Sequence, residues 1–314
     1  MEISVAPMMD WTDRHCRVFH RHLSQTVLLY TEMVVADAVI HGPRDRLLGF
    51  SDVEHPVVLQ IGGSDPGKLA EATAIGARFG YDAVNLNIGC PSDRVQSGRF
   101  GACLMREPEL VAECVTAMRV ATDVEVTVKC RLGVDDQEVE RTLPHFIETV
   151  AATGCRTFIV HARKAWLKGL SPKDNRTVPP LDYGLVRRMK AEFPELEIHL
   201  NGGLQSVEEA RENAIGLDGV MFGRAAYQNP WMLTEIDGFG GTREDVVEAM
   251  IAYCEWCEGE GLRHNALLRH MLGLYAGQPG ARGWRRHLST EGPKGRPADV
   301  LRSALRTLPQ AQAA

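Results

Sequence analysis

The sequence predicts a (β/α)8 barrel, or TIM barrel, followed by a small all-helical domain. Short runs rich in β-branched residues alternate with segments of helical periodicity, and eight such runs precede residue 240. From residue 241 onward no β-rich run follows, although helical patterns continue. We therefore expect a catalytic barrel over residues 1–240 and a helical domain over 241–314. An open, doubly wound sheet is the alternative for the first domain, because alternation alone does not close a sheet.

The elements follow in order along the chain. The expected strands lie at residues 3–6, 27–31, 57–61, 83–87, 124–129, 157–161, 197–201 and 219–222. The expected helices between them lie at residues 68–79, 109–121, 139–152, 183–192 and 207–213. Asp65 with Pro66, Pro108 and Ser206 provide N-cap or first-turn chemistry for three of these helices.

The second domain is expected to contain three helices, at residues 242–260, 262–275 and 297–308. Thr242 is the expected N-cap of the first, with Asp245 three residues later. The segment 277–296 is rich in glycine, proline and basic residues, which predicts a surface loop with a short helix.

Composition excludes several classes of protein. The chain is 44% hydrophobic and 24% charged, as in an ordinary globular protein. No apolar run approaches the ~18 residues that suggest a membrane span. The N-terminal residues lack the basic and long apolar regions of a secretory signal, and the eight cysteines form no framework of close spacings. We expect reduced thiols in a cytoplasmic protein without membrane or evident protein partners.

Charge is distributed unevenly along the chain. Residues 261–314 contain nine Lys or Arg and two acids, whereas the remainder contains 26 bases and 39 acids. A basic end on an acidic body suggests that this end meets a polyanion, and a solvated helical face is the alternative interpretation.

Polar residues and glycines cluster directly after the expected strands. The positions are Pro7, Met8, Met9 and Asp10, then Gln60, Gly62 and Gly63, Asn87, Gly89 and Cys90, Lys129 and Arg131, His161 and Arg163, Asn201, Gly202 and Gly203, and Gly223 and Arg224. Active sites of barrel enzymes lie at the carboxyl ends of the strands, so these positions predict one pocket. Polar loops alone would explain the polarity but not the recurrence of Lys, His, Gln and paired glycines.

The loops after the last two expected strands suggest a phosphate site. Asn201, Gly202 and Gly203 follow one strand, and Gly223 and Arg224 follow the next. Barrels often hold a phosphate between these loops, and glycine lets the backbone approach an anion closely. Tight turns alone are the alternative reason for the glycines.

Two further strand-end residues suit a flavin. Lys129 could offset negative charge on a reduced flavin, and the Gln60 amide can both donate and accept along its pyrimidine edge. Each residue alone could equally be a polar residue at the edge of the core. Their joint position favours a cofactor.

Cys90 follows the fourth expected strand in a Gly-Cys-Pro turn. A thiol is mostly protonated near neutral pH and can therefore donate a proton. Reduction of a carbon–carbon double bond needs a hydride and a proton from an acid. We expect Cys90 to be that acid, the alternatives being a buried structural cysteine or a covalent nucleophile.

Cys254 and Cys257, followed by His264 and His270, could indicate zinc or a redox pair. Both cysteines fall within a helical pattern that has no second C-x-x-C. We expect thiols on a helix packing face and no metal.

The motifs together resemble the tRNA-dihydrouridine synthase family, in order and over nearly the whole chain. They occupy residues 6–13, 60–63, 85–91, 201–203 and 223–224, and N-x-N-x-G-C-P at 85–91 is the most specific. Residues 8–17 and 280–289 look like the A-type subfamily, which acts on the D-loop at tRNA positions 20 and 20a.

The resemblance implies an FMN-containing barrel that is reduced by NADPH, with a helical domain that binds tRNA. It implies hydride transfer to C6 of uracil and protonation of C5 by Cys90. The flavin positions carry over onto Pro7, Met8, Met9, Gln60, Lys129, His161, Asn201, Gly202, Gly203, Gly223 and Arg224. The tRNA positions carry over onto Asn87, Lys173, Arg176, Arg282 and Arg285.

Two other functions are kept as alternatives. A dihydroorotate dehydrogenase-like enzyme is also an FMN barrel with a pyrimidine substrate, but it leaves the basic C-terminal domain unexplained. A non-catalytic tRNA-binding protein on a barrel scaffold would explain the basic domain without chemistry.

Overall fold

The structure is a computed structural model that describes residues 1–92, 95, 97–262 and 266–308. None of its described helices combines the length and the apolar character that crossing a membrane requires. Arg263, one of the nine basic residues of 261–314, and His264, considered above as a possible zinc ligand, lie outside the described residues.

By internal packing the chain divides into two compact units. The first unit consists of Met1–Asp10 and Leu28–Gly223, and the second consists of Trp11–Val27 and Arg224–Ala314. The second unit therefore includes two segments, 11–27 and 224–240, that fall within the expected first domain. Packing does not test where functional domains begin, so the division into 1–240 and 241–314 stays a prediction.

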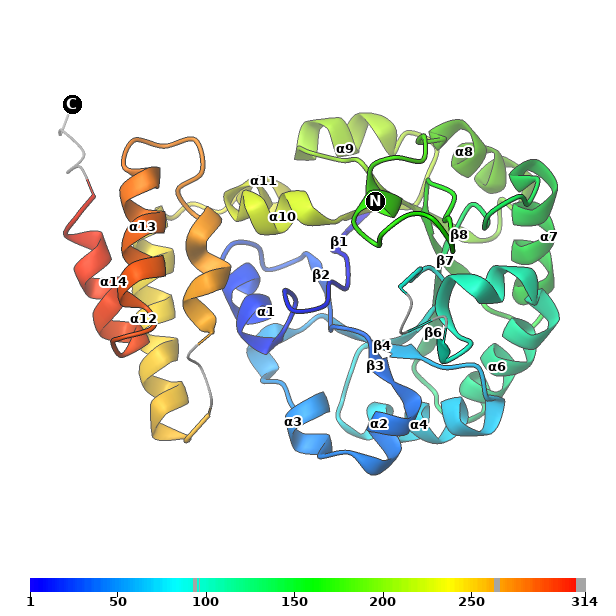
Figure 1. Ribbon diagram of the computed structural model, residues 1–314, viewed down its shortest axis with the longest axis horizontal. Helices are drawn as coiled ribbons and strands as arrows, with labels where there is room; N and C mark the ends of the chain where they lie inside the picture. Colours follow the sequence, from blue (N-terminus) through cyan, green and yellow to red (C-terminus); the bar gives the residue numbers. More distant parts are fainter. Residues whose placement is uncertain (93–94, 96, 263–265, 309–314) are drawn as a thin grey trace. The chain divides into compact units, whose positions relative to one another are not determined.

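The first unit is a closed barrel of eight parallel strands (Figure 1). The barrel strands are β1 (Glu2–Val5), β2 (Leu28–Tyr30), β4 (Val57–Gly62), β5 (Ala83–Asn87), β6 (Glu125–Arg131), β7 (Thr157–His161), β8 (Glu197–Asn201) and β9 (Gly219–Phe222). They pair in chain order, and the sheet closes where β9 pairs with β1, with Phe222 opposite Val5. The prediction of a TIM barrel is thus confirmed, and the open sheet is excluded.

A ninth strand, β3 (Val34–Val35), pairs with the end of β4 outside the closed ring. The sequence did not predict it, because two residues are too few to show a strand pattern.

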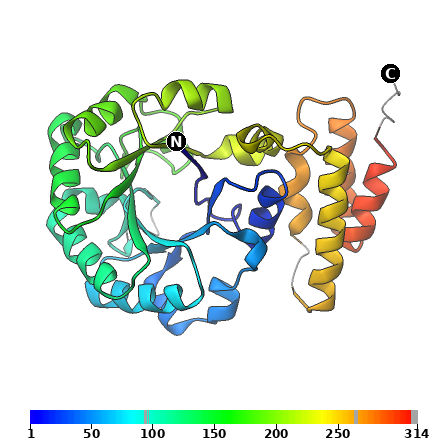
Figure 2. The same ribbon diagram turned by 180° about the vertical axis from the view of Figure 1, so that it is seen from behind.

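Helices cover the outside of the strands in Figures 1 and 2. They are α2 (Ala36–His41), α3 (Arg44–Leu48), α4 (Pro66–Arg78), α6 (Pro108–Val120), α7 (Val139–Ala151), α8 (Tyr183–Glu192) and α9 (Val207–Asn213), with short 3-10 turns η1 (Asp52–Glu54), η2 (Gly101–Arg106) and η3 (Asp174–Arg176). All five helices predicted for the barrel are present within two residues of their expected ends. Asp65 and Ser206 act as N-caps, as predicted, by accepting hydrogen bonds from the backbone N–H groups of Lys68 and Glu209.

The barrel interior changes from apolar to polar along the strands. Its apolar level is formed by Ala6, Tyr30, Val58, Ala83, Ile159 and Met221. Alternate residues of a strand share a face, so Gln60 follows Val58 into the interior, and Asn85 follows Ala83. Gln60 and Asn85 are buried. The polar level therefore lies toward the carboxyl ends of the strands.

The second unit is helical throughout its described residues. Its elements are α1 (Arg14–Arg21), α10 (Arg224–Gln228), η4 (Pro230–Leu233), α11 (Thr234–Asp237), α12 (Arg243–Gly259), η5 (Leu267–Gly273), α13 (Ala281–Glu291) and α14 (Pro297–Leu305). Thr242 caps α12 in a reciprocal pair with Asp245, as predicted. The 3-10 helix η5 packs against both α1 and α13, and α12 and α13 pack against α14.

One expectation for this unit was wrong, and another was right only in part. The α-helix expected at 262–275 is, in its described part, the 3-10 helix η5, which has hydrogen bonds such as Leu274 N–H to the Met271 carbonyl. The segment 277–296, expected to be a surface loop with a short helix, does contain a helix, the eleven-residue α13, but Trp284 and Leu288 are buried one turn apart on it. The flanking glycines and the many arginines obscured this apolar pair.

Candidate active site

A chain of side-chain amides crosses the polar end of the barrel. The Asn85 amide donates to the Thr127 hydroxyl at 2.8 Å, and Gln60 donates to the Asn85 amide oxygen at 2.8 Å. Asn87 in turn donates to the Gln60 amide oxygen at 2.8 Å. These four residues are buried, so each bond forms away from competing water.

The amide chain ends at the loop that contains Cys90. The Asn87 amide oxygen accepts hydrogen bonds from the backbone N–H groups of Gly89, at 3.1 Å, and Cys90, at 2.8 Å. Backbone N–H groups can only donate, which fixes the orientation of Asn87 and, through it, that of Gln60. Asn87, expected as a substrate contact, therefore also shapes the loop, and its amide retains at most one N–H for another acceptor.

Cys90 is half-buried, and its thiol donates to the Ser92 hydroxyl at 3.4 Å. Its backbone is held on the other side as well, because the Ala102 N–H donates to the Cys90 carbonyl at 2.9 Å. The thiol is thus partly accessible on a loop with a fixed backbone.

Lys129 lies on β6 beside Asn87, its register partner on β5. Its ammonium group donates to the Asn201 amide oxygen at 3.0 Å, and Asn201 donates to the Met221 carbonyl at 2.8 Å. Burial, together with the nearby Arg131 guanidinium, lowers the pKa of Lys129 to about 8. Among the described residues no carboxylate pairs with this ammonium, so an anion bound beside it would be favoured.

Arg131, two residues further along β6, is 3% exposed. Its guanidinium donates to three backbone carbonyls, those of Gly89 at 2.8 Å, Asn175 at 3.0 Å and Lys164 at 3.3 Å. Burial lowers its pKa to about 10, which leaves it charged near neutral pH. Arg131 therefore ties the Cys90 loop to the long loop that follows β7.

His161 and the paired glycines of the next strand are in close contact. A Cβ on Gly202 would lie 2.6 Å from the His161 ring, and Gly202 has φ 114°, a left-handed conformation that favours glycine. The Tyr183 hydroxyl donates to the Gly202 carbonyl at 2.5 Å. Burial, with the charges of Arg131 and Lys129, lowers the pKa of His161 well below its usual range, so it is neutral.

Gly202 and Gly203 are thus required by close packing and by their backbone conformation, which was the alternative to a phosphate role. Gly223 differs from them, because no described atom lies within 4 Å of the position that its Cβ would take. Close packing therefore does not account for the glycine at this position. Arg224, the next residue, begins α10.

The residues after β1 differ in exposure. Met8 packs against the apolar level of the barrel, and Pro7 is also half-buried. Met9 is 56% exposed. Pro7 and Met8 are therefore suited to an apolar contact with a planar ring.

The long loop that follows β7 contains Lys173 and Arg176, both exposed on or beside η3. The positive field of Arg176 and Arg163 reaches inward, since both lower the pKa of Arg131. Arg163 donates a hydrogen bond to the Pro179 carbonyl within the same loop.

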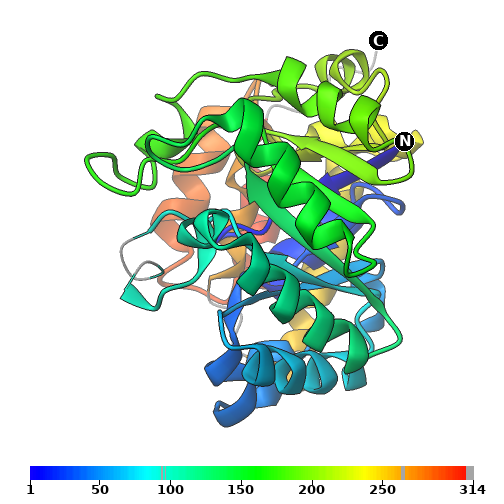
Figure 3. The ribbon, with the colours of Figure 1, turned by 90° about the vertical axis from the view of Figure 1, so that its right-hand side faces the viewer.

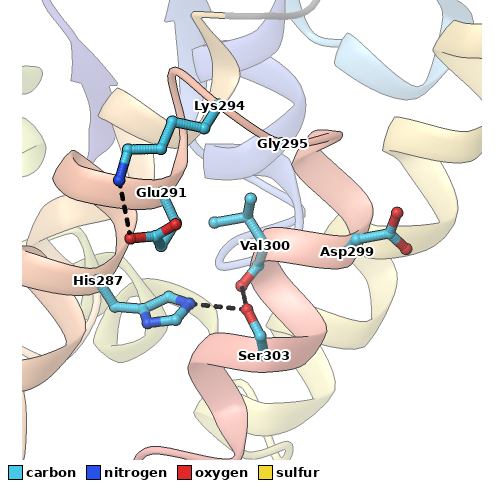
Figure 4. A pocket seen from close by; sticks show the side chains of 7 residues that line it. All are labelled: His287, Glu291, Lys294, Gly295, Asp299, Val300 and Ser303. Atoms are coloured by element: carbon cyan, nitrogen blue, oxygen red, sulfur yellow. Dashed lines mark hydrogen bonds and ion pairs between the residues drawn. The ribbon is translucent and has the colours of Figure 1, made fainter.

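Arg282 and Arg285 are both exposed on α13, and Arg282 lies on the side opposite the buried Trp284. Figure 4 shows the groove between α13 and α14, where His287 meets the Ser303 hydroxyl at 2.7 Å. Lys294 is paired there with Glu291 at 3.2 Å. Arg282 and Arg285 do not line this groove, and both are exposed to solvent.

Cys254 and Cys257 are buried free thiols of α12, as expected for a helix packing face. His270 pairs with Asp13 at 3.0 Å and contacts the Tyr227 hydroxyl at 3.1 Å. It thus serves the packing of the second unit.

The sequence did not single out Asn85, Thr127, Tyr183 or Asn175 as functional. For Asn85 a signal was present, because its spacing from Asn87 puts both on one strand face. Tyr183 and Asn175 hydrogen-bond to the backbone of Gly202 and Trp166, and no local sequence pattern predicts such contacts.

Comparison with known proteins places this geometry in a family. The sequence profile of "Dihydrouridine synthase (Dus)" matches residues 4–308. The chain is 56% identical over 298 residues to the tRNA-dihydrouridine(20/20a) synthase of Shewanella oneidensis, covering 93% of this chain and 89% of that protein. It is 54% identical to the protein of the same name from Vibrio cholerae, covering 98% and 96%.

Among solved structures, morphinone reductase shares the fold, with a TM-score of 0.53 at 14% sequence identity. The match covers 74% of this chain and 84% of that one. A likeness at this identity reports the barrel alone, whereas the profile and the relatives cover the whole site. The chain belongs to the dihydrouridine synthase family.

Proposed function

We propose that this protein is a flavin-dependent tRNA-dihydrouridine synthase. It reduces the C5–C6 double bond of uridine in the tRNA D-loop, at positions 20 and 20a, with FMN as cofactor and NADPH as electron donor. The observation that carries the proposal is the half-buried Cys90 thiol. Asn87 binds the backbone N–H of Cys90, and the cation Lys129 lies beside Asn87 on the neighbouring strand.

The donor set at the strand ends fits a flavin mononucleotide. Lys129 lacks a described carboxylate partner and would hold an anionic pyrimidine edge. Gln60, oriented by Asn85 and Asn87, retains donor and acceptor capacity for the same edge. The other proposed FMN-binding residues are Pro7, Met8, Met9, His161, Asn201, Gly202, Gly203, Gly223 and Arg224.

FMN, once reduced, supplies the hydride for C6 of uracil. The chain's own contribution is the proton for C5, which Cys90 donates from its thiol. The hydrogen bonds that hold the Cys90 N–H and carbonyl limit the reorganisation that this transfer requires. When its proton passes to C5, the Cys90 thiol becomes a thiolate, whose negative charge the nearby Arg131 and Lys129 cations stabilise.

To act on this substrate, the enzyme must bind folded RNA. A uridine within a structured loop must leave its stack to reach a barrel mouth, and folded RNA is recognised largely through shape and phosphates. We propose that Lys173, Arg176, Arg282 and Arg285 supply phosphate contacts and that Asn87 contacts the uracil. A tRNA substrate also suits the proposed cytoplasmic location and the proposed division into a catalytic domain, 1–240, and a tRNA-binding domain, 241–314.

The test is made on the purified protein loaded with FMN. Incubation with NADPH and an unmodified tRNA transcript is expected to yield dihydrouridine at positions 20 and 20a, detected by mass spectrometry of nuclease fragments. Oxidation of dihydroorotate without activity on tRNA would favour the first alternative function. A colourless protein that binds tRNA but cannot be loaded with FMN would favour the non-catalytic one.

A further inference from the structure

An exposed tryptophan stands on the long loop that follows β7. Trp166 is 41% exposed, and the Lys164 ammonium lies 5.8 Å from the centre of its ring. Figure 3 shows this segment in green, extending to the left beyond the strands. An exposed indole lacks the stabilisation that burial would give it, and its flat apolar face is available for stacking with a ligand ring.

Hydrogen bonds hold the backbone of Trp166 in place. The fully buried Asn175 accepts a hydrogen bond from the Trp166 N–H at 2.7 Å and donates to its carbonyl at 2.8 Å. The neighbouring Leu167 N–H donates to the Asp135 carboxylate at 2.7 Å. The indole is therefore an exposed side chain on a fixed support, and little conformational entropy is lost when something stacks on it.

This support is one side chain away from the Cys90 loop. The Arg131 guanidinium donates to the Gly89 carbonyl on one side and to the Lys164 and Asn175 carbonyls on the other. Trp166 thus belongs to the same end of the barrel as Cys90. A nucleotide adjacent to a uridine at Cys90 would therefore bind at the same end of the barrel as the indole.

The charges around Trp166 suit a phosphodiester chain. The loop contains Lys168 and Lys173, both exposed, and neither forms an ion pair with any described residue. The acids of the same loop are engaged, because Asp174 accepts from the Ser171 hydroxyl and Asp182 caps α8. Residues 162–182 contain five Lys or Arg and two Asp, so the loop keeps a net positive charge for an anionic partner.

We propose that the Trp166 indole is a stacking platform for an unpaired base of the substrate RNA that neighbours the target uridine, with Lys168 and Lys173 at the adjoining phosphates. The proposal rests on tRNA being the substrate. Withdrawal of the target base from its stack also exposes the face of its neighbour. An aromatic side chain that covers this face offsets part of the cost.

The experiment uses the FMN-loaded enzyme, NADPH and a tRNA transcript, with Trp166→Leu and Trp166→Phe as test variants. Leucine keeps apolar volume without a flat face, whereas phenylalanine keeps a ring. We expect Trp166→Leu to lower kcat/KM for tRNA by about 5- to 100-fold, mainly through KM, and Trp166→Phe to retain most of it. Val120→Ala, which truncates an 85% exposed side chain at the end of α6, is the control and should match the wild type.

Two further measurements separate stacking from loss of structure. NADPH oxidation with a small electron acceptor and no tRNA should be equal in all variants. Intrinsic fluorescence should be quenched when tRNA binds the wild type, and Trp166→Phe should lose a large part of that quenching. A transcript that is abasic at the stacked position should make the wild type and Trp166→Leu equivalent.

Equal kcat/KM for the wild type and Trp166→Leu would overturn this inference but leave the proposed function intact. The finding that this loop binds only a protein partner would have the same consequence. Equal losses in Trp166→Leu and Trp166→Phe also overturn it, because size rather than a flat face would then matter. A wild type that forms no dihydrouridine overturns the proposed function and this inference with it.

Discussion

Two sets of cations in this protein have opposite surroundings. Lys129 and Arg131 lie inside the barrel end and donate to fixed neutral oxygens, those of Asn201 and of three backbone carbonyls. Arg282 and Arg285 lie on the exposed face of α13, with water around them. The first set is buried in one geometry, and burial lowers the pKa values of both groups, whereas the second set is exposed to solvent.

The difference indicates how the two sets act. A cation that burial has already stripped of water interacts strongly with a nearby anion and cannot move away from it. An exposed cation attracts phosphate from any direction, and salt screens it. We therefore expect the interior pair to control chemistry and structure, and the exposed pair to control affinity for RNA.

The largest effect is expected for Arg131→Met. This change leaves the carbonyls of Gly89, Lys164 and Asn175 without their donor, and each unpaired buried group costs ~1–3 kcal/mol. We expect the free energy of unfolding in urea to fall by about 3 kcal/mol, with loss of dihydrouridine formation. Arg302→Met, which removes an exposed arginine paired with Glu255, should cost less than about 1 kcal/mol. Similar stabilities for the two variants would contradict the assignment of Arg131 as a structural tie.

The next effect concerns the pH dependence of stability at Lys129. Its pKa is about 8 in the folded chain and has the ordinary value of 10.5 when unfolded. Between these values the unfolded chain holds a proton that the folded chain has released, so the free energy of unfolding rises with pH. The rise is about 3 kcal/mol over this window, and below pH 8 the cost of burying the charge is constant.

The measurement compares the flavin-free wild type with Lys129→Met by urea unfolding from pH 7 to 10.5. Subtraction of the variant cancels the contributions of other groups. We expect Lys129→Met to be the more stable protein at pH 7 and the difference to shrink as the pH rises. A difference that is flat with pH would show that Lys129 is not desolvated.

A smaller effect is expected for the double variant Arg282→Ala/Arg285→Ala. Loss of two phosphate contacts should weaken tRNA binding about 5- to 20-fold and reduce the slope of log affinity against log salt by about 1.5. The matched control is Arg296→Ala/Arg302→Ala in the same unit, because Glu258 and Glu255 already neutralise those arginines. An unchanged slope in the test variant would remove Arg282 and Arg285 from the RNA contact.

The same contrast between regions applies to what the sequence predicted of the fold. The eight barrel strands and five of their helices were predicted within a few residues, because buried parallel strands show continuous apolar runs. The second unit was predicted less well. The Trp284–Leu288 pair of α13 is too short to stand out among arginines, and the 3-10 form of η5 depends on packing against α1 and α13.

The candidate site shows the same limit. The residues at strand ends could be predicted because strand order and the period of two place them on one face. The connections among them could not, since they join distant segments. Arg131 links residue 89 to residues 164 and 175, and Asn175 clamps Trp166 through its side chain. The roles predicted for the individual site residues stay predictions.

The central claim is that Cys90 donates the proton to the uracil. The measurement is dihydrouridine formed per enzyme by Cys90→Ala loaded with FMN, alongside its tRNA affinity and its rate of flavin reduction by NADPH. We expect binding and flavin reduction to stay within about twofold of the wild type, and turnover to fall by at least about 100-fold, the usual contribution of a general acid. Undiminished dihydrouridine formation by Cys90→Ala would contradict the account.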